Sequence, residues 1–375
     1  MMTTVEILAR LVSFKAVAGK PNGPIAEWAA EQLQQAGATV TKVPGPDAGR
    51  WNVFASFGPC DTPGIVLSGH LDVVPAWEPT WTSDPFTLIE RDGRLYGRGT
   101  ADMQGYIACV LGLAPRLAAL AKTRPIHVAL SCDEELGCRG VPTLLARLPE
   151  LCALPSGAVI GEPTNLTPVR GHKGKAAYRL EVTGQPGHSS RPELGLNAIH
   201  ALSDVLTQVV QQARALENGP RAADFAPPYS TMQAGVIAGG QALNVIPDLA
   251  SLQVEARAIP GVEPQALLTP ILDALDRLQA QGFGTHHEPL SSYPALRIDR
   301  QDPLVALVEA SCGQASVDAV SFGTEAGLFQ QAGIPAIVCG PGDIARAHKP
   351  DEYITRDELA RCSAFLERLL TASAN

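Results

Sequence analysis

Short, nearly continuous apolar segments alternate with helix-like segments through the first 170 residues, and this alternation constrains the fold most strongly. The apolar segments are Val53–Phe57, Ile65–Leu67, Ile126–Ser131 and Ala158–Ile160. Apolar residues at helical spacing mark Pro24–Ala36 and Met103–Ala121, the second of which we expect Pro115 to disturb. Strands that are covered on both faces have this unbroken apolar character. The pattern therefore predicts an α/β domain whose sheet is flanked by helices.

The pattern of strand-like and helix-like segments changes after Gly171–Gly174. Strand-like and helix-like segments then follow in β-α-β-β-α order: Ala177–Thr183, Leu196–Leu216, Thr231–Ala238, Leu252–Ala258 and Gln265–Gln281. The strand-like segments alternate polar and apolar residues, which is typical of a sheet with one solvent-exposed face. From about Pro289 the α/β pattern of the first 170 residues returns, with an apolar strand of the buried kind at Ala336–Cys339 and a final helix at Arg356–Leu370. We therefore predict an α/β domain in two segments, 1–173 and 289–375, and an inserted α+β domain, 174–288.

The composition excludes several classes of protein. The chain has 375 residues, a formal net charge of −9 and no basic tract, which argues against a nucleic-acid or anionic-membrane binder. No unbroken apolar stretch approaches the ~18 residues of a membrane span, and the first residues lack the features of a secretory signal. Eight cysteines without a Cys-x-x-Cys pair are typical of free thiols in a reducing compartment, so we expect a cytoplasmic protein.

Metal-ligand side chains cluster at the ends of the predicted strands. The segments that carry them are His70–Asp72, Asp102, Asp133–Glu135, Glu162 and Asp343–His348. Each alone has an ordinary interpretation, since an isolated His is usually structural and Asp102 could simply cap a helix. Together, two imidazoles and three carboxylates are typical ligands of a pair of zinc-like ions with one bridging carboxylate. Two ions about 3.5–4 Å apart can polarise one carbonyl group.

These motifs resemble those of the M20 family of metal-dependent amidohydrolases and peptidases over essentially the whole chain. The family-wide motifs are His70–Pro75, Gly99–Met103 and Asp133–Glu135. The acetylornithine deacetylase branch is most similar, through Gly161–Thr164, His172–Gly174, Gly187–Ser190, Gly340–Ile344 and Ala347–Tyr353. The resemblance implies a metallopeptidase-like catalytic domain with a mixed sheet flanked by helices, plus an inserted α+β dimerisation or lid domain.

The resemblance also implies two divalent metal ions, with zinc as the first choice and cobalt as the alternative. His70 and Glu162 would bind one ion, Glu135 and His348 the other, and Asp102 would bridge them. Position 162 departs from other branches of the family, which have Asp there, so the way in which this carboxylate binds stays open. The residues themselves do not distinguish zinc, cobalt and manganese, because all three accept mixed His and carboxylate ligands.

Five further residues receive roles from the resemblance. Asp72 would support the first imidazole ligand, and Glu134 would be the general acid and base. His188 would stabilise the oxyanion in the active site of the partner subunit. Arg257 and Asn244 would lie near the substrate carboxylate. The residues alone leave plainer interpretations open here, because His188 lies in a polar loop and Arg257 ends a strand, where a surface charge is ordinary.

The implied activity is hydrolysis of N2-acetyl-L-ornithine to L-ornithine and acetate, a step of arginine biosynthesis, by a homodimer that acts on a small N-acyl amino acid. Related M20 enzymes stay open as alternatives: N-acetylcitrulline deacetylase, succinyl-diaminopimelate desuccinylase and dipeptidase. An inactive binding module on the same scaffold is the alternative from another class. Two residues have open roles. Glu325 would either face the substrate amine or be an ordinary carboxylate at the start of a helix. Lys173 would either contact the substrate or be a solvent-exposed charge that solvates the start of a strand.

Overall fold

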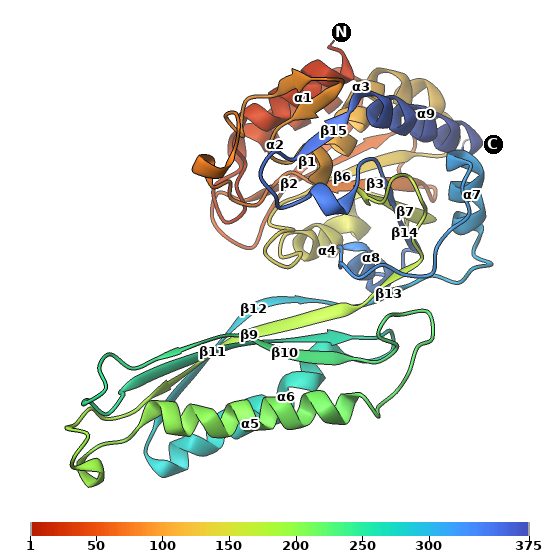
Figure 1. The fold of residues 1–375 in the computed structure, drawn as a ribbon. Coiled ribbons are helices and arrows are strands. Elements are labelled where there is room, and N and C mark those ends of the chain that lie inside the picture. Colours follow the sequence, from red (N-terminus) through yellow and green to blue (C-terminus); the bar gives the residue numbers. More distant parts are fainter. Residues whose placement is uncertain (1, 374–375) are drawn as a thin grey trace. The chain divides into compact units, whose positions relative to one another are not determined.

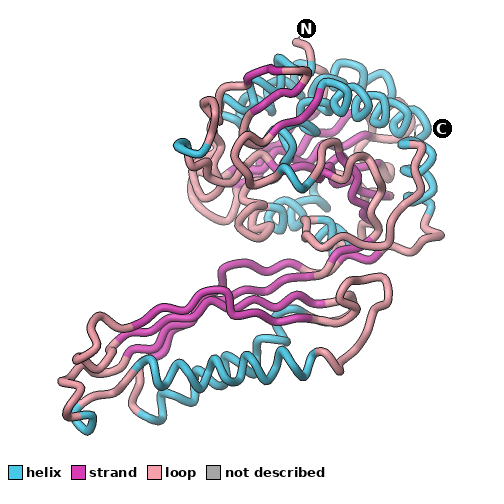
Figure 2. Tube along the Cα trace, viewed as in Figure 1, coloured by secondary structure: helices cyan, strands magenta, loops and turns pink. Residues whose placement is uncertain are grey.

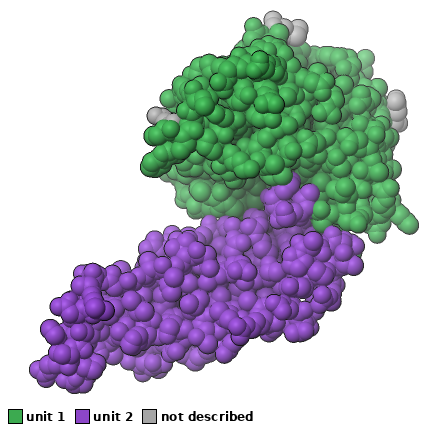
Figure 3. Space-filling view, viewed as in Figure 1, with its two compact units in different colours: residues 1–171, 296–319, 324–375 green, residues 172–295, 320–323 purple. Residues whose placement is uncertain are grey.

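The structure, a computed structural model, describes residues 2–373 and divides into two compact units (Figure 3). Unit 1 comprises residues 1–171, 296–319 and 324–375, and unit 2 comprises residues 172–295 and 320–323. The sequence placed the two boundaries at 173 and 288, whereas the structure has them at 171 and 295. The second difference arises because β12, Gly284–Tyr293, belongs to the sheet of unit 2 and runs past the predicted boundary at 288.

Unit 1 is built on a six-stranded mixed sheet. Its strands, in order across the sheet, are β1 Thr39–Pro44, β2 Trp51–Phe57, β6 Ile126–Ser131, β3 Ile65–His70, β7 Gly157–Pro163 and β14 Ala336–Gly340. The four strands from β6 to β14 run parallel, while β1 and β2 are antiparallel to their neighbours. Every residue of β3, β6, β7 and β14 is buried, as the unbroken apolar segments predicted. The α/β prediction is confirmed for this unit.

Helices cover the two faces of this sheet (Figure 1). The helices are α1 Thr4–Ser13, α2 Gly23–Gln35, α3 Gly105–Leu120, α4 Val141–Leu151, α7 Pro303–Cys312, α8 Ala326–Gln331 and α9 Arg356–Ser373. α1, α3 and α9 pack together on one face, and α4 and α8 lie on the other. Local signals explain where several begin: Thr3 and Glu6 form a capping box at α1, and the Asp302 side chain accepts the Leu304 N–H at α7.

The central helix of unit 1 corrects one sequence expectation. The stretch Thr100–Leu120, a π-type turn followed by α3, contains a window with a mean hydropathy of 1.3 and is long and apolar enough to cross a membrane, although no such stretch was expected from the sequence. The most apolar window of this stretch is 61% buried within the protein, where α3 packs against α1 and α9. Its apolarity is therefore that of a core helix. The helix also continues through Pro115, which we expected to disturb it.

Several short elements complete the secondary structure. A small antiparallel sheet joins β15 Tyr353–Thr355, β5 Arg94–Tyr96 and β4 Ile89–Arg91. The short strands β8 Gly171–His172 and β13 Leu296–Arg297 lie where the chain passes between the units. Single helical turns occupy Glu78–Thr80, Pro192–Leu194, Arg277–Gln281 and Ile344–Arg346, and a π-type turn occupies Thr100–Gln104.

Unit 2 is a four-stranded antiparallel sheet with two helices on one face (Figures 1 and 2). In order across the sheet, the strands are β10 Thr231–Gly239, β11 Leu249–Ala258, β9 Gly174–Thr183 and β12 Gly284–Tyr293. The helices are α5 Ala198–Leu216 and α6 Pro264–Asp276. Burial alternates residue by residue along β11, so one face of the sheet packs on the helices and the other stays open, as the alternating sequence predicted.

A close approach in unit 1 leads to a prediction about stability. Gly161 lies in β7, and a methyl group added there would stand 2.1 Å from ring carbons of Tyr106 in α3, a residue only 1% exposed. We expect Gly161→Ala to lower the free energy of unfolding by about 1–3 kcal/mol, because the sheet and the helix must separate. The matched control is Gly235→Ala in β10, where an added methyl group meets nothing within 4 Å. Equal denaturation midpoints for the two variants would contradict this packing.

Candidate metal centre

The parallel strands of unit 1 bring the predicted ligands to one edge of the sheet. His70 ends β3, Glu135 follows β6, and Glu162 lies near the end of β7, and these three strands are neighbours. β14 lies beside β7 and leads to His348. Because the carboxyl ends of parallel strands meet at the same edge, side chains far apart in the sequence converge there.

The first ligand group joins His70, Asp102 and Glu162. His70 Nε2 lies 3.0 Å from Asp102 Oδ1 and 3.7 Å from Glu162 Oε1. All three side chains are buried, and one ligand atom from each lies within 4.8 Å of the other two. A nitrogen and two carboxylate oxygens at this spacing can surround one divalent cation.

The second ligand group joins Asp102, Glu135 and His348. His348 Nε2 lies 3.3 Å from Asp102 Oδ2 and 3.0 Å from Glu135 Oε2, and the three ligand atoms again lie within 4.8 Å of one another. Asp102 thus offers one carboxylate oxygen to each group, which is the geometry of a bridging ligand. The backbone of His348 is in the left-handed region, with φ 59°, a conformation that non-glycine residues adopt mostly where the surroundings hold them.

Electrostatics indicate that this cluster is built for cations. Burial raises the pKa of Glu162 well above its ordinary value, and the nearby Asp102 carboxylate raises it further. Burial and the Glu135 carboxylate outweigh the opposing effect of His70, so that the pKa of Glu134 is raised to about 8 and that of Asp72 to about 7. Burying so many carboxylates together is unfavourable unless positive charge accompanies them. The mixed His and carboxylate donors fit two divalent metal ions, one in each group.

A buried carboxylate holds the loop that carries the bridging ligand. Glu352 accepts hydrogen bonds from the backbone N–H groups of Gly99 (2.9 Å), Ala101 (2.8 Å) and Asp102 (3.1 Å), and from Arg98 Nη1 (2.7 Å). The sequence places Glu352 in a motif, four residues after His348, but does not predict this role.

Asp72 supports the site in a different way from the one expected. The Nδ1 atom of His70 is 2.8 Å from the backbone carbonyl of Asp72 and 3.8 Å from its carboxylate. The carboxylate instead accepts the backbone N–H groups of Glu134 (3.2 Å) and Glu135 (3.1 Å). Asp72 therefore orients the imidazole through its main chain and the Glu134–Glu135 loop through its side chain.

Three further hydrogen bonds fix the loop around Glu134. The Cys138 thiol donates to Glu134 Oε1 at 3.1 Å, a contact that the sequence analysis missed because neither residue type predicts the pair. Asp133, whose backbone is left-handed with φ 51°, accepts from Arg50 Nε at 2.9 Å and from the Gly19 N–H at 2.8 Å. The Glu134 side chain thus stands beside both ligand groups on a loop that is braced from two sides.

Glu325 stands at the start of a helix, as one of its two interpretations predicted, but its carboxyl group is engaged elsewhere. The carboxyl group is 1% exposed and accepts hydrogen bonds from Ser68 Oγ (2.6 Å) and Ser131 Oγ (2.7 Å). Burial raises its pKa. The residue stands at the start of α8, but its side chain makes no capping hydrogen bond there. Glu325 therefore ties the ends of β3 and β6 together from beneath the ligands, with its oxygens already engaged.

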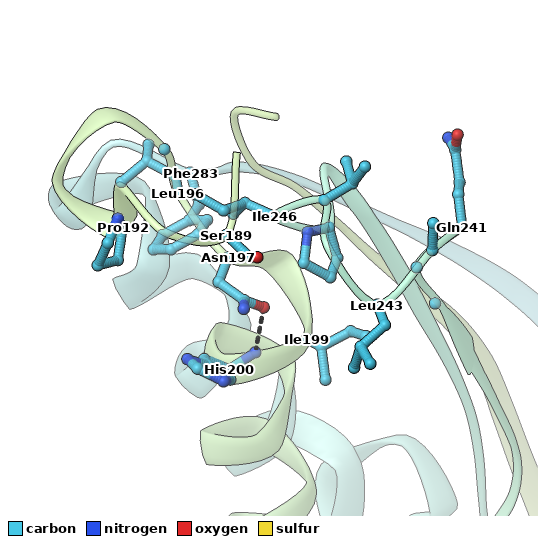
Figure 4. A pocket seen from close by; sticks show the side chains of 16 residues that line it. Ser189, Pro192, Leu196, Asn197, Ile199, His200, Gln241, Leu243, Ile246 and Phe283 are labelled. Carbon is cyan, nitrogen blue, oxygen red and sulfur yellow. Dashed lines mark hydrogen bonds between the residues drawn. The ribbon is translucent and has the colours of Figure 1, made fainter. Parts of the chain in front are cut away.

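In unit 2, the structure brings His188 and Asn244 together. His188 pairs with Val245 in a β-bridge, the Ser189 N–H donates to the Asn244 carbonyl (3.1 Å), and the Ile246 N–H donates to the Gly187 carbonyl (2.8 Å). The two loops form a ribbon beside a cavity of about 890 Å³, which Figure 4 shows lined by Ile199, Leu243, Ile246 and their neighbours.

Arg257 lies at the opposite end of the same sheet. It pairs with Lys175, whereas Leu249 pairs with Thr183 at the end from which the His188 loop leaves. Lys175 and Thr183 are eight residues apart on β9, or about 27 Å at ~3.4 Å per residue. Sequence reasoning grouped Arg257 with Asn244, and the strand register separates them.

Polar contacts hold the Arg257 end of the sheet. Arg257 donates through Nε to Glu255 and through Nη1 to the Tyr293 hydroxyl, each at 3.1 Å. Lys173 is 7% exposed, and its ammonium group donates to the Tyr229 carbonyl at 2.6 Å. The expectation that Lys173 solvates a strand start is therefore wrong, because the side chain is buried and its charge is bound by a backbone acceptor.

Comparisons with known proteins agree with this description. A model of the peptidase family M20/M25/M40 matches residues 66–372. An acetylornithine deacetylase of Proteus mirabilis is 34% identical over 94% of this chain and 92% of its own length, and one of Photorhabdus laumondii is 32% identical over 98% and 96%. Among solved structures, an M20 family metallo-carboxypeptidase of Sulfolobus solfataricus has a TM-score of 0.81 at 17% identity, with 100% of each chain covered.

The α/β fold and the two ligand groups that share Asp102 define a dinuclear metallohydrolase. The chain belongs to the peptidase family M20/M25/M40. It is a hydrolase that acts on amide bonds, and its site takes two divalent metal ions.

Proposed function

We propose that this chain hydrolyses N2-acetyl-L-ornithine to L-ornithine and acetate, and so serves arginine biosynthesis. The observation that carries the proposal is the similarity to relatives named acetylornithine deacetylase, at 32–37% identity over most of the chain. The site supports it, because every position that an amide hydrolysis requires is filled by a suitable side chain.

The metal ligands are His70 and Glu162 for one ion, Glu135 and His348 for the other, and Asp102 for both. When bound, the two ions supply electrophilic activation of the substrate carbonyl and lower the pKa of a water molecule. We favour zinc and keep cobalt as the alternative, because mixed imidazole and carboxylate ligands suit both. The eight free cysteines favour a reducing compartment, so we place the protein in the cytoplasm.

Glu134 moves the protons of the reaction. It stands next to the ligand Glu135, and the Asp72 carboxylate and the Cys138 thiol hold its backbone and side chain in place. Glu134 removes a proton from the attacking water as the new C–O bond forms. It then delivers that proton to the amide nitrogen as the C–N bond breaks, and acetate and the free amine leave.

His188 donates a hydrogen bond to the oxygen that becomes negative in the transition state. Arg257 pairs with Lys175, about 27 Å along β9 from Thr183, after which the chain leads to the His188 loop, so we propose that His188 and Asn244 act in the active site of a partner subunit. Arg257 remains with its own chain and binds the substrate carboxylate, for which a guanidinium group held by Glu255 and Tyr293 is well suited.

The surface of unit 2 supports a homodimer. β10 is the last strand of its sheet, so one of its edges is unpaired among the described strands. Val236 and Ile237 on this strand are 51% and 56% exposed, and Leu243 in the following loop is fully exposed. An exposed edge with apolar side chains favours pairing with a second chain.

A substrate panel with chelation tests the proposed activity. We expect amine release from N-acetylornithine with kcat/KM at least roughly ten-fold above that for N-acetylcitrulline and N-succinyl-diaminopimelate, because the relatives that cover most of this chain are named acetylornithine deacetylase. Removing the metal with a chelator should abolish release, and adding zinc or cobalt should restore it. A higher kcat/KM for N-acetylcitrulline or N-succinyl-diaminopimelate would show that this compound, and not N-acetylornithine, is the preferred substrate. Release that survives complete metal removal would contradict the dinuclear mechanism.

A further inference from the structure

The His188 imidazole is held by its own loop on one side only. The Nδ1 atom lies 3.2 Å from the backbone N–H of Ser190 and 2.7 Å from the Ser190 hydroxyl oxygen. The Nε2 atom has no hydrogen-bond partner among the described residues of this chain, so it is the nitrogen available to a ligand.

The backbone contact decides which nitrogen carries the proton. A backbone N–H can only donate, so the Nδ1 atom that receives it must present its lone pair. A neutral imidazole with a free lone pair on Nδ1 has its proton on Nε2. The Ser190 hydroxyl, which can donate or accept, then donates as well, and both donors share the one lone pair.

We propose that Ser190 is a positioning residue that fixes His188 in the tautomer whose Nε2 carries the proton. A ring held in this way presents a hydrogen-bond donor to a substrate oxygen. It cannot bind a metal ion through Nε2, because that binding would need a lone pair there. The loop thus holds His188 as a hydrogen-bond donor, whereas His70 and His348 serve as metal ligands. The kinetic part of this inference rests on the proposed function, and the tautomer does not.

The neighbouring β-ribbon keeps this arrangement in register. His188 is bridged to Val245, and the Ser189 N–H donates to the Asn244 carbonyl at 3.1 Å. The backbone on either side of the imidazole is therefore fixed, and the Ser190 hydroxyl restrains rotation of the ring itself.

Nitrogen NMR on the metal-loaded full-length protein, with 15N-labelled histidine, tests the tautomer without substrate. The His188 signals are identified by their loss in His188→Ala. We expect Nδ1 at the shift of an unprotonated ring nitrogen and Nε2 at that of a protonated one. The opposite pattern, or averaging of the two forms in the wild type, would overturn the proposal.

Kinetics on three variants test the positioning role. We expect Ser190→Ala to lower kcat by roughly three- to ten-fold with little change in KM or metal content, since one neutral hydrogen bond is lost while the backbone donor stays. Ser190→Thr keeps the hydroxyl and should keep kcat, and Ser189→Ala, the matched control, should leave it unchanged. Equal kcat for Ser190→Ala and wild type would overturn the positioning role. If the wild type does not hydrolyse N-acetylornithine, the proposed function fails and the NMR result still stands on its own.

Discussion

Glu134→Gln is expected to retain both metal ions and to lose roughly 10²–10⁴-fold in kcat, because the amide neither removes a proton from water nor delivers one to the leaving amine. Glutamine has nearly the same size as glutamate, and the backbone N–H of residue 134 keeps its hydrogen bond to the Asp72 carboxylate. The ligand loop should therefore stay in place. Metal content is measured by elemental analysis, and turnover by amine release from N-acetylornithine.

Glu150→Gln is the matched control for this loss. Glu150 lies at the end of α4 with 63% of its side chain exposed and pairs with Arg147 on the same helix, so its substitution should change kcat by less than about two-fold. A Glu134→Gln variant with near-wild-type kcat would remove Glu134 from proton transfer. A variant that has lost its metal ions would show instead that Glu134 stabilises the ligand loop.

Mixing two inactive variants should restore activity if the active site is shared between subunits. Glu134→Gln and His188→Ala are each expected to be nearly inactive, the second by about 10²–10³-fold, as is typical when a donor to the oxyanion is removed. In a mixed dimer, one site would combine an intact Glu134 with an intact His188 from the other chain. Random exchange of subunits should therefore restore about a quarter of wild-type activity.

The alternative predicts a different outcome for the same mixture. If His188 served the site of its own chain, each chain of a mixed dimer would keep its own defect, and activity would stay at the level of the parents. Differently tagged variants show whether subunits have exchanged. Full exchange with no recovery would contradict the shared site and leave the assignment of Glu134 untouched.

The sequence predicts the ligand positions well because each depends on a local pattern. His70 and Glu162 directly end apolar strands, and neighbouring parallel strands must bring such residues to one edge. The sequence does not predict the residues that support them. Glu352 reaches the Asp102 loop across some 250 positions of the chain, and such contacts depend on the tertiary structure.

The misplaced boundary of unit 2 has a local cause. β12 is mostly exposed along its length, so it lacks the regular apolar alternation of β11 and contains Pro289 and two adjacent histidines. An edge strand over an open face needs little apolar patterning, and its sequence is therefore close to that of a loop. The sequence also does not show that Arg257 and Asn244 of one chain occupy opposite ends of one sheet, because only the strand register shows it.

The order of the ligands along the chain sets when the centre can be completed during synthesis. Four of the five ligands have left the ribosome once residue 162 has emerged, but His348 and the Glu352 carboxylate that braces Asp102 follow nearly two hundred residues later. A nascent chain thus holds three unpaired carboxylates and one imidazole while the whole of unit 2 is still being translated. The second ion can be bound only once residue 348 has emerged, so a product truncated before His348 would lack one of the five metal ligands.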